Sequence, residues 1–129
     1  MLDTNILVSI IFFPSFVTKR FVKALSKYDI VICDYVIKEL QIVTERKFPH
    51  KLETLNRFFY EDLKYQLVML PEKLELEQFP RVRDEKDTPI LAISIIEDVD
   101  IFVTGDKDFF ALRIERPKIV TMIEFIEKY

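Results

Sequence analysis

Four acidic side chains stand at places in this sequence where carboxylates can act together on a cation. They are Asp3, Glu39, Asp87 and Asp106. If the fold brings them to one mouth, each pair about 5 Å apart repels by roughly 3 kcal/mol at an effective dielectric of 20. Such a group must take up protons or bind a cation. Ligands that are all oxygen suit Mg²⁺ or Mn²⁺, and either ion can activate water to attack a phosphodiester.

The aspartates also have a simpler interpretation as caps and turn residues. Asp3 can cap the segment that follows it, and Asp87 or Thr88 can stand at the N-cap of an apolar helix. Asp106 and Asp108 lie in the stretch TGDKDF, where a strand is predicted to end, and can serve a turn and a short helix. Each aspartate taken alone therefore fits a structural role as well as a cation site.

Glu39 has no such alternative, because it is predicted to lie in the middle of a helix. Its neighbours at helical spacing are Val36, Ile42 and Val43, three or four residues away. Glu39 therefore borders the apolar face of the helix, where a glutamate is rarely placed without a partner. This position favours a functional role over a solvated one.

The elements that must position these acids alternate along the chain. Short, mostly apolar runs predict buried strands at 29–33, 66–70, 100–104 and 118–121. Amphipathic or apolar periodicity predicts helices at 16–28, 34–48, 52–63, 88–99 and 122–129, with a short helical turn at 108–112 and a long loop at 71–87. This order indicates an α/β domain with a parallel sheet covered by helices. In such sheets, sites form at the carboxyl ends of the strands.

Composition excludes several other classes of protein. A chain of 129 residues with half of them hydrophobic is most simply one domain with a sizeable core. The net charge of −3 does not suit a protein that coats nucleic acid by bulk electrostatics. One cysteine, Cys33, and one histidine, His50, allow neither an internal disulfide nor a zinc site. No stretch reaches the roughly 18 apolar residues of a membrane span, so we expect a cytoplasmic protein without a membrane partner.

Four motifs in order resemble a known family. LDTNILVS near the start, IKEL in a helix, RDEKDTPILAIS, and VTGDKDF before IVTMIEFI together resemble the PIN-domain ribonucleases. The likeness is greatest to the small prokaryotic members found as toxins of toxin–antitoxin pairs, and it covers nearly the whole chain. The resemblance implies a single PIN-like domain over residues 1–129 with a three-layer α/β/α fold. It also implies cleavage of single-stranded RNA that depends on Mg²⁺ or Mn²⁺.

The resemblance assigns roles to particular residues. The four acids of the family match Asp3, Glu39, Asp87 and Asp106, and Asp108 is a plausible auxiliary ligand. The positions that in the family orient carboxylates or the attacking water match Thr4, Asn5 and Thr104. The mechanism implied is in-line attack on phosphorus by water that the metal activates. One departure is that only Met1 and Leu2 precede Asp3, so either the opening strand is short or the native N-terminus lies upstream of Met1.

Partners follow from the resemblance rather than from the residues. It implies a homodimer and an antitoxin that covers the site. Basic residues near the expected mouth are Arg81, Arg83, Lys86 and Lys107, which either contact RNA phosphates or solvate the loop and pair with Asp84 and Glu85.

Two other functions remain open from the sequence. A catalytically inactive module of the same fold that binds RNA or protein is one, although the retention of all four acids argues against it. A phosphotransfer or phosphatase domain is another, but the residue two positions after Asp3 is Asn5 rather than the aspartate that a dehalogenase-type phosphatase requires.

Overall fold

The computed structural model describes all 129 residues, and its helices and strands follow one another in a mixed α/β order. The helices are α1 (Thr4–Phe12), α2 (Phe16–Leu25), α3 (Asp34–Lys47), α4 (Leu52–Arg57), α5 (Thr88–Ile96), α6 (Lys107–Phe110) and α7 (Met122–Lys128). The strands are β1 (Val31–Cys33), β2 (Gln66–Val68), β3 (Ile101–Val103) and β4 (Lys118–Val120). Single turns of 3₁₀-helix occupy Pro49–Lys51, Leu76–Gln78 and Glu85–Asp87, and a π-turn extends α4 over Phe58–Asp62.

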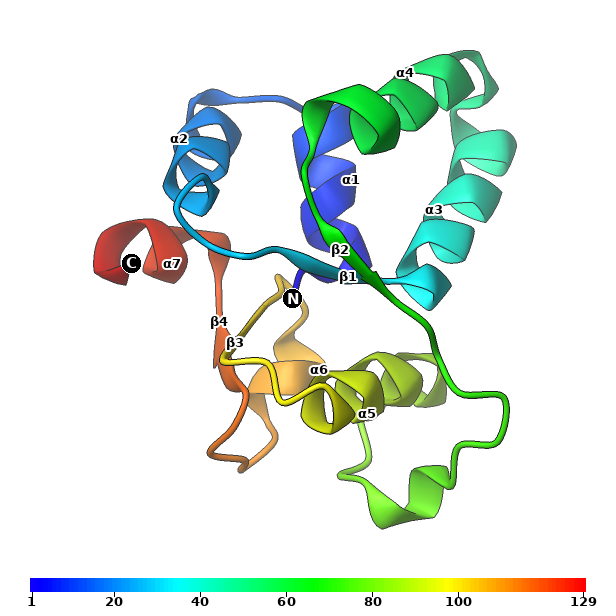
Figure 1. Cartoon of the computed structure of the whole chain (residues 1–129), viewed down its shortest axis with the longest axis vertical. Helices are drawn as coiled ribbons and strands as arrows, with labels where there is room; N and C mark the ends of the chain where they lie inside the picture. The colour runs from blue at the N-terminus through cyan, green and yellow to red at the C-terminus, as the bar shows by residue number, and fades with distance from the viewer.

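All the strand pairs are parallel, which confirms the α/β class predicted from the alternating pattern. β1 pairs with β2, and β3 pairs with β4. Leu2 adds one parallel bridge to Val103. Figure 1 shows α1 and α3 rising on one side of β1 and β2, with α5 and α6 on the opposite side.

The core consists of apolar segments that are packed on all sides by other elements. Ile90, Leu91 and Ile93 of α5 are almost inaccessible to solvent, as expected for a helix that is apolar all round. Cys33 is also buried, and burial raises the pKa of its thiol to about 11, so it is an inert core residue. These elements form the rigid base from which the acidic residues project.

The first helix was not anticipated as a separate element. α1 ends at Phe12, because Pro14 follows and cannot continue a helix. Ser15 then starts α2 with a reciprocal capping box to Thr18. No single helix is long and apolar enough to cross a bilayer. Only α1 and α2 taken together have that length and apolarity, and their axes are bent by 118° relative to each other.

The loop at 71–87 is tied to the domain near its end. Val82 is completely buried, and its backbone N–H donates to the hydroxyl of Thr88 at 3.4 Å. The 3₁₀ turn Glu85–Asp87 then leads directly into α5. The loop therefore places Asp87 at the start of α5.

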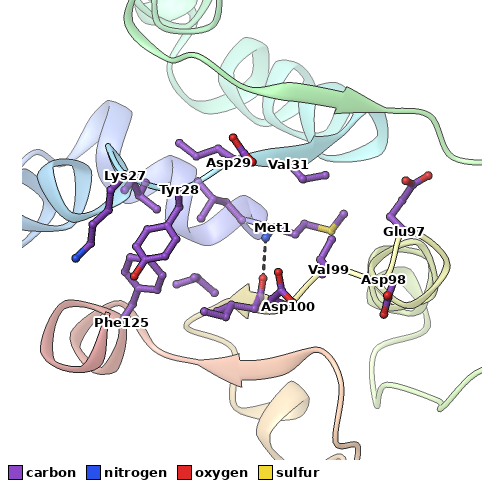
Figure 2. A pocket seen from close by; sticks show the side chains of 15 residues that line it. Met1, Lys27, Tyr28, Asp29, Val31, Glu97, Asp98, Val99, Asp100 and Phe125 are labelled. Carbon is purple, nitrogen blue, oxygen red and sulfur yellow. Dashed lines mark hydrogen bonds between the residues drawn. The ribbon is translucent and has the colours of Figure 1, made fainter.

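A separate cavity of about 380 Å³ opens at the amino ends of the strands. Its lining is mainly apolar, with Asp29, Asp98 and Asp100 among the polar residues (Figure 2). The amino group of Met1 donates to the carbonyl oxygen of Ile101 at 2.7 Å in its wall. This amino-edge cavity lies at the opposite end of the strands from the acidic residues predicted to act together.

Candidate active site

One open cleft of about 630 Å³ brings the four predicted acids together. It is lined by Asp3, Glu39, Asp87 and Asp106, along with Thr4, Asn5, Val8, Ser9, Phe13, Val43, Lys47 and Phe48. The four carboxylates come from four separate segments of the chain. Three of those segments begin helices just after strands or turns, so their convergence follows from the parallel arrangement of the strands.

Asp3 is the most constrained of the four. Its backbone N–H donates to the carbonyl oxygen of Val103 at 3.0 Å, which continues the bridge that Leu2 begins. One carboxylate oxygen accepts the N–H of Thr4 at 2.8 Å, so Asp3 does cap α1. The other oxygen accepts the Thr104 hydroxyl at 2.7 Å and the Asn5 amide at 2.9 Å. These hydrogen bonds fix the side chain in the wall of the cleft, where the residue is only 3% exposed.

The hydrogen bonds around Asp3 join the first motif to the last. The amide oxygen of Asn5 accepts the N–H of Gly105 at 2.9 Å, and the hydroxyl of Thr104 accepts the N–H of Asp106 at 3.1 Å. Asn5 and Thr104 therefore both contact the carboxylate of Asp3. Thr4 differs, because its hydroxyl is buried in the cleft wall without any hydrogen-bond partner.

Asp106 and Asp108 lie close in sequence but face different surroundings. Asp106 accepts the N–H of Asp108 at 2.9 Å, which makes it the cap of α6, and it also lines the cleft. Asp108 lies outside the cleft lining and accepts the guanidinium of Arg83 at 3.0 Å. The structure thus keeps Asp106 with the other acids and separates Asp108 from them.

Asp87 stands at the N-cap position of α5 but makes no capping hydrogen bond. Its pKa is raised to about 7, first by burial and then by the negative charges of Asp3, Asp106 and Asp84. Burial also raises the pKa of Asp3, with smaller contributions from Glu39 and Asp106, against the lowering effect of its hydrogen bonds to Thr104 and Thr4. The acids are therefore close enough to oppose each other's ionisation.

Glu39 faces the cleft from the middle of α3, as its helical neighbours indicated, and is half-buried. Tyr35, one turn earlier, donates its hydroxyl to the carbonyl oxygen of Lys86 at 2.9 Å. This contact joins α3 to the turn that carries Asp87. Tyr35 is a positioning residue that the sequence did not reveal, because the bond links residues 51 positions apart.

The donor set fits an oxygen-preferring cation by its chemistry. No three acidic, histidine or cysteine side chains are grouped closely enough here to hold one metal ion directly. Mg²⁺, however, usually keeps several waters and is held by one or two carboxylates together with substrate phosphates. Carboxylates spread along one cleft meet that requirement.

Comparison with known families decides which family these motifs represent. The family model described as "PIN domain" matches residues 1–115 of the chain. The chain belongs to the PIN domain family. No curated protein and no solved structure compared with the chain gave a match. PIN domains are generally nucleases and typically use divalent metal ions, so the acidic cleft is the candidate active site of a nuclease-type hydrolase.

The basic residues expected to contact RNA are not among those that line this cleft in the PIN domain. Arg81, Arg83 and Lys107 are exposed, and none of them lines it. Arg83 is paired with Asp108 rather than with the acids of its own loop. The cation that does line the cleft is Lys47. Its position two helical turns after Glu39 is a signal that could have identified it.

Proposed function

We propose that this PIN domain is a metal-dependent ribonuclease that hydrolyses phosphodiester bonds of single-stranded RNA. The observation that supports the proposal is the convergence of Asp3, Glu39, Asp87 and Asp106 on one cleft. Burial and neighbouring negative charges raise the pKa values of Asp3 and Asp87, and groups perturbed in this way cluster at functional sites. Mg²⁺ or Mn²⁺, bound there, lowers the pKa of water and stabilises the charge that develops on the phosphate.

The four acidic residues have different roles in the proposed hydrolysis. Asp3, fixed by its bonds to Thr4, Asn5 and Thr104, presents a rigid carboxylate that can hold the ion. Glu39 and Asp106 approach from different elements and complete the acidic wall. Asp87 lines the same cleft, and its carboxylate can accept a proton from the attacking water.

The direct test is cleavage of a fluorescently labelled single-stranded RNA with Mn²⁺ or Mg²⁺, compared with EDTA. Asp106→Asn is the most informative variant, because asparagine caps a helix about as well as aspartate but lacks the charge. The matched control is Asp62→Asn, the same substitution at an exposed position outside the cleft. We expect the wild type and the control to cleave with either metal and Asp106→Asn to lose at least a hundredfold in rate. Equal rates for all three proteins would refute the proposal.

The proposal extends to the toxin of a toxin–antitoxin pair, a homodimer whose active site an antitoxin covers. This part rests on the likeness to small prokaryotic PIN domains. Expression of the wild type without a partner should arrest bacterial growth, and expression of Asp106→Asn should not. If both proteins are tolerated equally while the purified wild type cleaves RNA, the toxin role is wrong and the ribonuclease remains.

A further inference from the structure

The acidic cleft changes character away from the strands. α1 and α3 rise side by side (Figure 1). Residues of both helices line the cleft. Asp3 precedes α1 and Phe13 follows it, ten residues later, which corresponds to about 15 Å at 1.5 Å per residue. On α3, Lys47 lies two turns beyond Glu39. The far end of the cleft is therefore formed by Phe13, Lys47 and Phe48 rather than by acids.

The aromatic residues at this end are held in a definite arrangement. Phe12 is 3% exposed and stacks on Phe48, with ring centroids 5.3 Å apart and planes at 28°. Phe13 meets the same Phe48 ring edge-on at 5.9 Å and 79°. Phe13 nevertheless remains 58% exposed. Its ring is thus supported from the core through Phe48, while much of its surface is open within the cleft.

Lys47 supplies the only positive charge among the residues that line the cleft. It lies in the last turn of α3, is exposed, and forms no ion pair. The same cleft thus presents an exposed aromatic ring and an unpaired ammonium group. Proteins bind single-stranded nucleic acid with this combination, because bases stack on the ring and the charge contacts the backbone.

We propose that Phe13, supported by Phe48 and accompanied by Lys47, is a stacking platform for one unpaired base of the RNA substrate. This inference rests on the proposed function, because it places the scissile phosphate at the acids. A stacked strand advances about 3.4 Å per nucleotide, so a base on Phe13 lies within about four nucleotides of that phosphate. Bases in a duplex are stacked on each other and cannot be read in this way. The platform therefore selects single strands.

The test is a scan of RNA octamers in which one nucleotide at a time lacks its base. Binding is measured by fluorescence anisotropy with Ca²⁺ in place of Mg²⁺ to slow turnover, for wild type, Phe13→Ala and Phe13→Tyr. The control is Phe16→Ala, which removes a ring that is 76% exposed and does not line the cleft. Circular dichroism confirms that each variant is folded.

We expect the wild type to lose about 5- to 150-fold in affinity when the base is missing at one or two positions. Phe13→Ala should bind the intact octamer more weakly by a similar factor and should no longer respond to the missing base. Phe13→Tyr and Phe16→Ala should behave as the wild type. Cleavage of the intact octamer with Mn²⁺ is measured on the same proteins.

Several results would overturn the platform. These are binding by Phe13→Ala that equals the wild type, a response to the missing base that survives in Phe13→Ala, duplex RNA bound as tightly as single strands, or no RNA binding at all. The first two, found together with cleavage by the wild type, would remove the platform and leave the ribonuclease intact. Phe13-dependent binding without cleavage would support the platform and refute the ribonuclease.

Discussion

Replacing Asp87 with asparagine should stabilise the metal-free protein at alkaline pH while it weakens metal binding. In the unfolded chain the pKa of Asp87 is about 3.8, and in the folded protein it is about 7. Between these values the folded protein keeps a proton that the unfolded chain has released. The free energy of unfolding therefore falls as pH rises through this window.

The magnitude follows from the size of the pKa shift. A shift of about three units corresponds to about 4 kcal/mol at 1.36 kcal/mol per unit. Asp87 is only partly buried, so solvent screening reduces this to about 1–2 kcal/mol. Asp3 contributes a loss of the same sign, but it is present in both proteins being compared.

The assay is urea unfolding in EDTA at two pH values, near 4.5 and near 8. Most of the pH range in which Asp87 loses its proton in the folded protein lies between them. From the lower to the higher pH, the free energy of unfolding of the wild type should fall by about 1–2 kcal/mol more than that of Asp87→Asn. The free energy of unfolding of Asp62→Asn should change as that of the wild type does. Adding Mn²⁺ at about 100 times its dissociation constant should stabilise the wild type by about 2.7 kcal/mol and Asp87→Asn by much less. Parallel pH dependences for wild type and Asp87→Asn would show that the charge of Asp87 is not opposed by its neighbours.

Three further changes test other parts of the site. Glu39→Gln should weaken Mn²⁺ binding at least tenfold by calorimetry, whereas Glu45→Gln on the exposed face of α3 should leave it unchanged. Thr104→Val removes the 2.7 Å hydrogen bond to buried Asp3 and should cost about 1–3 kcal/mol in urea unfolding; an unchanged midpoint would contradict the orienting role. Gly105→Ala should be nearly neutral in the same assay, because a Cβ there would stand 3.5 Å from its nearest neighbour, an ordinary contact, and the residue has no positive φ.

The sequence predicted most of the fold because its strands are short apolar runs separated by well-marked helices. The apolar surroundings of Glu39 and the positions of three aspartates after strands or before helices were sufficient to propose that four acids meet. Local spacing carries this information, since the carboxyl ends of parallel strands lie at one edge. The structure places all four acids on one cleft, as that reasoning required.

What the sequence did not predict depends on contacts between distant segments. The ion pair of Arg83 with Asp108, a carboxylate outside the cleft lining, joins residues 25 positions apart. The wall formed by Phe13 and Phe48 arises because the ends of α1 and α3 meet in space. Arg83 and Phe13 each lie in a stretch whose local pattern allows either a solvated or a functional role, so only the tertiary arrangement distinguishes the two.

Capping and cation binding are combined in this site rather than being alternatives. Asp3 and Asp106 each use an oxygen to accept a backbone N–H at a helix start, which holds the carboxylate in place and supports its charge. Asp87 occupies the same kind of position without that bond, and its pKa is raised to about 7. It is therefore an acid whose charge the fold leaves poorly supported. Thr104→Val and Asp87→Asn should consequently shift stability in opposite directions, since the first removes a hydrogen bond to a buried carboxylate and the second removes a charge that burial and neighbouring acids oppose.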